Sequence, residues 1–226
     1  MTLTRDLPLV PDQSALLIID VQNFNCSREG GEFAHLDDAA FEAQVGPFLR
    51  HIHAETIPNM ARIQAAFRQK GMEVIYTNIE SLTKDGRDRS LDYKITGFNV
   101  PRGSWDAQTI DALKPGEDEI VIPKTSSSVF ISTNIDYVLR NLGVRQLVMV
   151  GLLSDQCVES AIRDACDLGY LVTEVTDACA TITPERHASS LKAIRGYCRQ
   201  VTTAQLLAEI GGNQSGNQTG ATAAVT

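Results

Sequence analysis

Short apolar segments alternate with amphipathic helical patterns along most of this chain. The apolar segments predict strands at 15–19, 72–77, 119–122, 146–150, 170–175 and 198–201. Apolar residues recur at helical spacing between several of them, at 57–70, 106–113, 133–142, 158–168 and 184–195. Strands that are apolar throughout and separated by helices are typical of a parallel sheet covered on both sides. The sequence therefore predicts an α/β fold: a single doubly wound domain of Rossmann-like topology, with a six-stranded parallel sheet flanked by helices.

The chain of 226 residues is long enough for one domain with a full core, which we place at residues 1–210. From Gly211 onward the residues are too small and polar to pack, so 211–226 is predicted to be a disordered tail. Residues 81–104 are also polar and show little periodicity. We expect this long loop either to close over a site or to meet a neighbouring subunit.

Charge and composition exclude several classes of partner. The net charge is -8 and no cluster of Lys or Arg is present, so we expect no nucleic-acid partner and no anionic membrane partner. No apolar run approaches the ~20 residues that cross a bilayer, and the N-terminus has no apolar signal segment, which favours a cytoplasmic protein. The 5 cysteines lack C-x-x-C spacing, which favours reduced thiols over disulfides or structural zinc.

One cysteine follows the predicted strand at 146–150 directly. Ser154 stands where a helix N-cap belongs, so the helix whose apolar pattern covers 158–168 would begin just after Ser154, with Cys157 about three residues into it. Unpaired backbone N–H groups and the helix dipole at that point favour a thiolate over a thiol. The alternative is a buried core cysteine. We assign that ordinary role to Cys166, Cys179 and Cys198.

Two more chemically capable side chains stand at strand ends. Asp20 ends the first predicted strand and Lys124 follows the third. Because ligands bind at the carboxyl ends of the strands in an open parallel sheet, both side chains and Cys157 are expected to meet at one edge. An unperturbed thiol needs a base, and Asp20 can accept its proton and return it to a leaving group. The lysine would keep the carboxylate ionised and steady the thiolate.

The same positions carry a family resemblance. Residues 20–23 (Asp-Val-Gln-Asn), 123–130 (Pro-Lys-Thr-Ser-Ser-Ser-Val-Phe) and 151–160 (Gly-Leu-Leu-Ser-Asp-Gln-Cys-Val-Glu-Ser) resemble the three signature blocks of the isochorismatase-like cysteine hydrolases. The match is collinear across about residues 12–209. The resemblance implies a six-stranded parallel sheet and a catalytic triad of Cys157, Asp20 and Lys124.

The resemblance also implies an oxyanion hole next to a non-proline cis peptide bond. Carried onto this chain, the cis bond joins Leu152 and Leu153, and the donors are the backbone N–H groups of Leu153 and Cys157. Such a bond costs about 3 kcal/mol and persists only where the surrounding structure fixes it.

Within this family the cysteine implies an amidohydrolase, because the isochorismatases proper lack it. The expected reaction is cleavage of a C–N bond in a small amide, ureido or carbamoyl compound, with release of ammonia through a thioester. The turn at Gly30-Gly31 and residues 103–106 resemble the branch that acts on ureidoacrylate, biuret and N-carbamoyl compounds. Nicotinamidases, a related group, hold a metal through closely spaced histidines, but the close pair His51 and His53 lies beyond that region. We therefore expect no metal, and we also expect no cofactor. The family resemblance implies a homodimer or homotetramer.

Several side chains near the strand ends are candidates for substrate contact. Amide groups at Gln22 and Asn78 would suit a ureido or carbamoyl group, and Arg102 could hold a carboxylate. The full set of candidates is Gln22, Asn78, Glu80, Arg102, Ser128 and Phe130, with Tyr93 and Trp105 in or near the long loop. Three alternatives stay open: a thiol redox sensor on the same fold, a nicotinamidase-type hydrolase, and a catalytically silent subunit.

Overall fold

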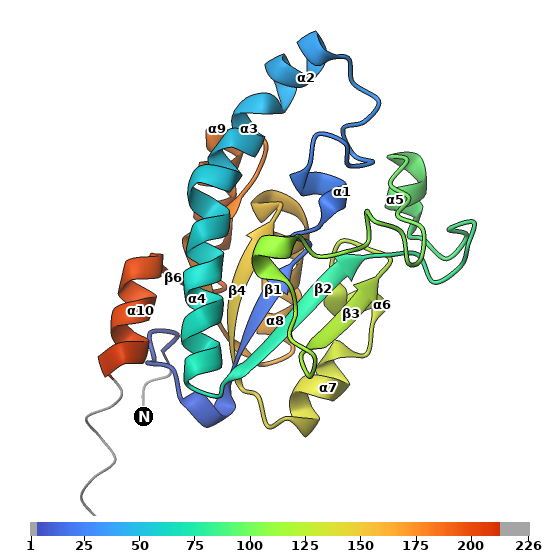
Figure 1. The fold of residues 1–226 in the computed structure, drawn as a ribbon. Coiled ribbons are helices and arrows are strands. Elements are labelled where there is room, and N and C mark those ends of the chain that lie inside the picture. The colour runs from blue at the N-terminus through green and yellow to red at the C-terminus, as the bar shows by residue number, and fades with distance from the viewer. Residues whose placement is uncertain (1–3, 213–226) are drawn as a thin grey trace, which may run out of the picture.

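The six predicted strands form one sheet in which all neighbouring strands are parallel (Figure 1). The computed structural model describes residues 4–212. The strand order is β3-β2-β1-β4-β5-β6, so the direction of winding reverses between β1 and β4. This is the doubly wound sheet expected from the sequence. The strands are β1 (Ser14–Ile19), β2 (Glu73–Ile79), β3 (Ile120–Lys124), β4 (Gln146–Leu152), β5 (Leu171–Ala180) and β6 (Arg199–Val201).

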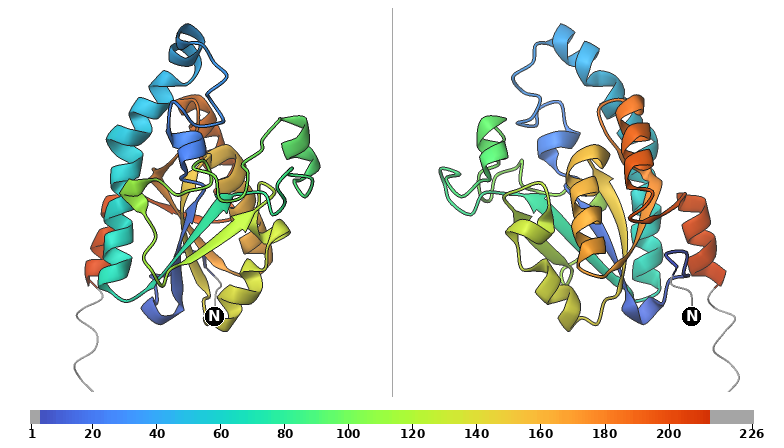
Figure 2. Two further views of the ribbon diagram at one scale, coloured as in Figure 1. Left: turned by 45° about the vertical axis from the view of Figure 1, so that its right-hand side comes forward. Right: turned by 180° about the vertical axis from the view of Figure 1, so that it is seen from behind.

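Helices cover both faces of the sheet (Figure 2). Those within the described residues are α1 (Asn23–Cys26), α2 (Asp38–Gln44), α3 (Gly46–His51), α4 (Ile57–Gln69), α5 (Leu91–Ile95), α6 (Val129–Ser132), α7 (Ile135–Asn141), α8 (Glu159–Asp167), α9 (Pro184–Ile194) and α10 (Thr203–Gly212). Shorter turns are the 3-10 elements η1 (Pro11–Gln13) and η3 (Asp111–Leu113), and the π-helical elements η2 (Ile52–Thr56) and η4 (Ser154–Val158).

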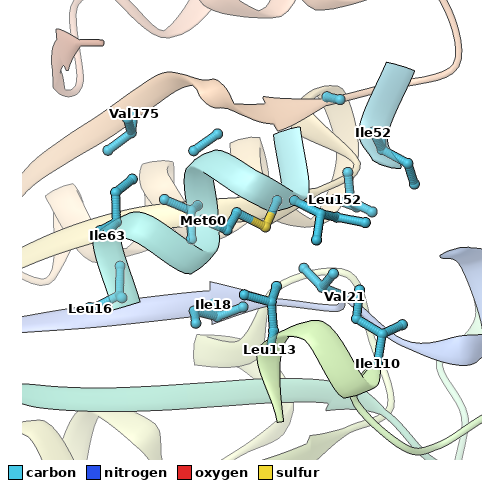
Figure 3. Close-up of a cluster of buried hydrophobic side chains, with 14 of the residues drawn as sticks. Leu16, Ile18, Val21, Ile52, Met60, Ile63, Ile110, Leu113, Leu152 and Val175 are labelled. Atoms are coloured by element: carbon cyan, nitrogen blue, oxygen red, sulfur yellow. The ribbon is translucent and has the colours of Figure 1, made fainter. Parts of the chain in front are cut away.

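Alternate residues of the central strands feed two separate cores. Leu16 and Ile18 of β1 pack in one cluster with Met60 and Ile63 of α4 (Figure 3). Leu17, between them in sequence, belongs to a second cluster with residues of α7 and α8 on the opposite face. Both faces of β1 are therefore dry, which explains its uninterrupted apolar sequence.

The helix predicted at 57–70 is the last part of a longer helical segment that begins at Gly46. α3 and η2 lead directly into α4, and with α2 they extend beyond the sheet (Figure 1). The buried apolar residues at the N-cap and within this helical segment before α4 are Val45, Phe48, Leu49 and Ile52. Their spacing of three and four residues is typical of one face of a helix.

The helix predicted at 106–113 is wrong, because only the short turn η3 forms there. The backbone of this segment instead pairs with the residues that follow β1. The N–H groups of Asn23 and Phe24 donate to the carbonyls of Gln108 and Asp106, at 3.0 and 3.3 Å. The N–H of Ile110 donates to the Val21 carbonyl at 3.1 Å. These non-local bonds replace the helical ones and outweigh the local pattern.

The C-terminal part of the described chain is α10, which ends at Gly212. The helix therefore includes Gly211 and Gly212, the first two residues of the predicted tail. The rest of that tail, 213–226, lies outside the described residues. Across residues 4–212, no helix has the length and apolar character that a membrane span requires.

A buried carboxyl group on β5 should make stability depend on pH. Glu174 is fully buried; one oxygen accepts a hydrogen bond from Gln200 Nε2 at 3.0 Å and the other has no hydrogen-bond partner. Burial raises the pKa of Glu174 from 4.5 to about 7. A carboxyl whose pKa is raised on folding adds stability below its unfolded pKa and loses it as the pH rises through its folded pKa.

We therefore expect Glu174→Gln to raise the free energy of unfolding at pH 8 by roughly 2–3 kcal/mol. At pH 4.5 the carboxyl of the native protein is protonated, so the variant should differ little from wild type. Urea denaturation at the two pH values measures the difference. The same stabilisation at both pH values would contradict this account.

Candidate active site

Asp20, Lys124 and Cys157 meet at the carboxyl ends of β1, β3 and β4. Asp20 follows the last residue of β1, Lys124 ends β3, and Cys157 lies in the π-helical turn η4 after β4. Lys124 Nζ is 2.8 Å from Asp20 Oδ2 and 3.4 Å from Cys157 Sγ. The exposed fractions of these three residues are 0%, 0% and 5%, so the cluster is screened from bulk water.

The backbone at Asp20 is held in the left-handed conformation, with φ of 54°. A residue other than glycine adopts this conformation only when its surroundings fix it. The Asp20 N–H donates to the Thr77 carbonyl at 2.9 Å, and the Asn25 side chain donates to the Asp20 carbonyl at 2.8 Å. Thr77 Oγ1 also donates to Asp20 Oδ1 at 3.2 Å. The backbone of Asp20 is thus fixed from β2 and from α1, and its carboxylate is held from β2.

Gly151 allows the end of β4 to lie directly against β1. A Cβ atom built at Gly151 would lie 2.2 Å from the Ile19 carbonyl oxygen, and its φ is 137°. Neither the space nor the backbone conformation accommodates another residue type. The glycine therefore sets the close approach of the strands that lead to Asp20 and to the turn of Cys157.

The turn that carries Cys157 begins one residue earlier than the sequence predicts. The peptide bond between Leu152 and Leu153 is cis, and Leu153, rather than Ser154, is the N-cap. The N–H of Val158 donates to the Leu153 carbonyl at 3.2 Å, a bond that a regular α-helix would give to Cys157. The π-helical turn therefore changes which amide closes the first turn.

Ser154 forms hydrogen bonds with two residues of α9 instead of capping the helix. Ser154 Oγ lies 2.8 Å from His187 Nδ1, and Ser190 Oγ donates to the Ser154 carbonyl at 3.1 Å. His187 Nε2 lies 3.1 Å from the carbonyl of Thr176, which only accepts. Nε2 therefore carries the proton and Nδ1 of the neutral ring accepts from Ser154. Burial lowers the pKa of His187, which favours this neutral form.

The electrostatics of the cluster favour a protonated thiol beside an ion pair. Burial raises the pKa of Cys157 to about 12, although the charge of Lys124 opposes this. Burial would lower the pKa of Lys124, but the charges of Asp20 and Cys157 outweigh it and the pKa is raised. Burial also raises the pKa of Asp20 against the opposing effect of Lys124. These shifts favour a resting thiol on Cys157 rather than the expected thiolate. The raised pKa of Asp20 makes its carboxylate a stronger base for the thiol proton.

The segment 81–104 contributes a side chain to this cluster. It contains the short helix α5, whose N-cap Ser90 accepts from the Tyr93 N–H at 3.2 Å. The Tyr93 hydroxyl lies 3.1 Å from Lys124 Nζ and 3.7 Å from Cys157 Sγ, and Tyr93 is 2% exposed. Sequence analysis placed Tyr93 only in or near the loop, because nothing in the pattern indicated a helix that turns inward.

A second carboxyl group near Asp20 was missed by sequence analysis. Glu32 lies on the turn after α1, and its N–H donates to the Phe24 carbonyl at 3.2 Å. Burial and the charge of Asp20 raise the pKa of Glu32 to about 8. Burial and the charge of Glu32 also raise the pKa of Cys26, which keeps that thiol protonated. Burial and the charge of Asp20 both favour the protonated form of Glu32.

The two amide candidates for substrate contact are occupied by the protein itself. Gln22 Nε2 donates to the carbonyls of Ile79 and Asp106 at 3.0 and 3.2 Å, and its Oε1 accepts from the Ile79 N–H at 2.7 Å. Asn78 Nδ2 donates to the Ala107 carbonyl at 3.0 Å. Both side chains thereby hold the segment 105–110 over the sheet. Their contact with a substrate stays a prediction.

The remaining candidates have varied positions. Glu80 Oε1 accepts from the Gly103 N–H at 2.7 Å and closes the long loop. Arg102 is exposed, and Trp105 is 50% exposed. Ser128 caps α6 by accepting from the Phe130 N–H at 3.3 Å, and the Phe130 ring packs against Tyr170. Of these remaining candidates, Ser128 and Phe130 lie closest in sequence to a residue of the cluster, which is Lys124.

No group of three or more potential metal-ligating side chains occurs within residues 4–212. His51 lies 3.9 Å from the carboxylate of Glu55, and His53 Nε2 lies 2.8 Å from the Cys26 carbonyl. The close histidine pair is therefore engaged in separate local contacts.

Known proteins match most of this chain. A family model for the isochorismatase domain matches residues 14–205. The ureidoacrylate amidohydrolase RutB of Acinetobacter baylyi is 32% identical over 209 residues, which are 88% of this chain and 84% of that protein. RutB of Rhizobium rhizogenes is also 32% identical, over 195 residues, with 79% and 75% of the two chains covered.

Solved structures share the fold. A cysteine hydrolase from Pseudomonas syringae pv. phaseolicola superposes with a TM-score of 0.77 at 23% identity and covers 91% of this chain and 96% of its own. The N-carbamoylsarcosine amidase of Thermoplasma acidophilum gives a TM-score of 0.63 at 26% identity, with 84% and 96% covered. The family match spans β1 to α10 and includes all three residues of the buried cluster. The chain therefore belongs to the isochorismatase family.

Proposed function

We propose that this protein is a cysteine-dependent amidohydrolase that cleaves a C–N bond of a small amide, ureido or carbamoyl compound and releases ammonia. The observation that carries the proposal is the buried cluster in which Lys124 Nζ contacts both Asp20, at 2.8 Å, and Cys157 Sγ, at 3.4 Å. A nucleophile, a base and a cation in contact are the parts that acyl transfer requires. The 32% sequence identity to RutB proteins, which are named ureidoacrylate amidohydrolases, supports this choice of reaction.

In the first half-reaction Asp20 accepts the thiol proton as Cys157 Sγ attacks the substrate carbonyl carbon. The sulfur–carbon bond forms, and the carbonyl electron pair moves to oxygen. The backbone N–H groups of Leu153 and Cys157 are the proposed donors to that oxyanion. Asp20 then gives its proton to the departing nitrogen as the C–N bond breaks, which leaves a thioester on Cys157 and releases ammonia.

The second half-reaction consumes water. The oxygen of a water molecule attacks the thioester carbonyl carbon while Asp20 accepts a proton from that water. The carbon–sulfur bond then breaks. The proton returns from Asp20 to the Cys157 sulfur, and the acid product leaves. Lys124 remains protonated throughout, because its raised pKa keeps the ammonium charged while negative charge moves between carboxylate and sulfur.

The test is ammonia release from a panel of small amides and ureides. The panel contains ureidoacrylate, biuret, triuret, N-carbamoyl amino acids, nicotinamide and maleamate, with the Cys157→Ala variant as the blank. Release from at least one compound by the wild type, and none by the variant, is expected. No release from any compound by the folded wild type would count against the amidohydrolase proposal.

The raised pKa of Glu32 predicts a loss of activity in alkaline solution. Above about pH 8 this carboxyl ionises and adds negative charge near Asp20, which disfavours the thiolate and the oxyanion. We expect kcat/KM to fall as the pH rises through about 8, and Glu32→Gln to move this fall upward by about one pH unit or remove it. A pH–rate profile measures the effect. Glu29→Gln, which alters an exposed carboxylate three residues away, is the matched control.

We also propose that the protein is a homodimer or homotetramer. Large apolar side chains are exposed on α5 and α6: Leu91 is 73%, Ile95 75% and Ile131 73% exposed. Contacts with a second copy would remove these side chains from water. The same contacts would hold α5, and with it Tyr93, in place.

A further inference from the structure

We propose that Tyr93 is a fourth catalytic residue, whose hydroxyl donates a hydrogen bond to the sulfur of Cys157 and stabilises the attacking thiolate. This inference rests on the proposed cysteine chemistry. It extends that chemistry to a side chain supplied by the 81–104 segment rather than by a sheet strand.

The direction of the hydrogen bonds follows from the groups involved. The Tyr93 oxygen lies 3.1 Å from Lys124 Nζ, and an ammonium group only donates. The Tyr93 oxygen must therefore accept from Lys124, which leaves the phenolic hydrogen for another acceptor. Cys157 Sγ, at 3.7 Å, is within hydrogen-bonding reach of that hydroxyl, because bonds to sulfur are longer than bonds to oxygen.

The hydroxyl keeps its proton in this setting. Burial raises the pKa of Tyr93, and although Lys124 opposes this, the pKa stays well above its ordinary value. A phenol that does not ionise is a constant donor over the working pH range. The bond from Tyr93 lowers the pKa of Cys157 and so offsets part of the effect of burial.

The surrounding contacts hold the phenol in position before substrate arrives. The Ser90 N–H donates to the carbonyl of Thr125, the neighbour of Lys124, at 2.9 Å. The Tyr93 ring packs 5.6 Å from the Phe98 ring and belongs to a small buried cluster with Ile79 and Val100. The hydroxyl is thus fixed both through the backbone of α5 and through its own ring, which reduces the reorganisation needed in the transition state.

Two donors consequently reach the sulfur from different elements. Lys124 Nζ approaches from the end of β3 at 3.4 Å, and the Tyr93 hydroxyl from α5 at 3.7 Å. The sulfur carries negative charge twice in the proposed cycle: when it attacks the amide and when it leaves the thioester. Tyr93 would stabilise both states, so its loss should slow acylation and deacylation alike.

The test uses Tyr93→Phe, which removes only the hydroxyl, and Tyr137→Phe as the matched control, because Tyr137 is 69% exposed. The first readout needs no substrate: the rate of Cys157 alkylation by iodoacetamide between pH 7 and 10, followed by peptide mass spectrometry. The second readout is kcat/KM for whichever compound the wild type hydrolyses. Thermal unfolding of all three proteins reports whether the fold is retained.

We expect Tyr93→Phe to slow the alkylation of Cys157 and to lower kcat/KM, each by ~10–100-fold, with Tyr137→Phe unchanged. An unchanged alkylation rate in a folded Tyr93→Phe protein would overturn the proposal, even if kcat/KM fell. If the variant does not fold, 3-fluorotyrosine at position 93 replaces it: its more acidic hydroxyl should speed alkylation, and no change would overturn the proposal. If wild type hydrolyses nothing, the alkylation rates still decide the role of Tyr93.

Discussion

Cys157→Ala should release no measurable ammonia from a compound that the wild type hydrolyses, a loss of about 10⁴-fold or more in kcat. The substitution removes the atom that forms the acyl bond, and no neighbouring side chain can replace it. Asp20 and Lys124 remain as an ion pair at 2.8 Å, so the variant should fold and still bind substrate. Ammonia release and the KD for substrate, measured on the same preparation, separate the two effects.

Cys166→Ala is the matched control for that variant. Cys166 lies on α8, the helix that follows the turn of Cys157, and it is half-buried rather than buried as the sequence predicted. Its removal should leave ammonia release within about two-fold of wild type, because substitutions of partly exposed residues away from a site have small effects. A Cys157→Ala protein with wild-type turnover would show that the sulfur takes no part in the reaction.

Lys124→Met should abolish most activity and also destabilise the protein. Methionine fills similar space but leaves the carboxylate of Asp20 fully buried without a counter-ion. Loss of one partner of a buried ion pair costs about 3–5 kcal/mol. The pKa of Asp20, already raised by burial, would then rise further, so Asp20 would be protonated at neutral pH and unable to accept the thiol proton.

The sign of the pH dependence follows from that shift. Because the folded pKa of Asp20 would exceed its unfolded value, the stability of Lys124→Met falls as the pH rises and approaches that of wild type at low pH. Urea denaturation at pH 5 and pH 8 measures this. The double variant Asp20→Asn/Lys124→Met should recover much of the stability but none of the activity. A Lys124→Met protein as active as wild type would rule out the role given to the ammonium.

The sequence allowed all six strands and their parallel arrangement to be predicted, because strands buried on both faces have no polar alternation. It also allowed Asp20, Lys124 and Cys157 to be brought together, since each stands at a strand end. The helix expected at 106–113 failed for a physical reason. Its backbone groups bond to the segment after β1, and no local pattern reports the approach of residues some 80 positions apart.

The surroundings of the cluster were harder to predict than its members. The sequence offers the amides of Gln22 and Asn78 as candidates for substrate contact, and in the structure they bond to the backbone of Ile79 and Ala107, which no local pattern predicts. Tyr93 lies on a short helix and contacts the cluster, and Glu32 lies on a turn and interacts electrostatically with Asp20. Both relations depend on tertiary packing. The pKa of Cys157 was also hard to predict, because position at a helix start lowers it whereas burial raises it.

The most direct test of the central claim is to catch the thioester. Wild-type enzyme is mixed with its substrate, quenched in acid during turnover, and analysed by intact-mass and peptide mass spectrometry. The account predicts an adduct on Cys157 with the mass of the substrate minus ammonia, which disappears when hydroxylamine is added before the quench. Continued ammonia release with no adduct on Cys157, and no hydroxamate formed with hydroxylamine, would contradict the proposed covalent mechanism.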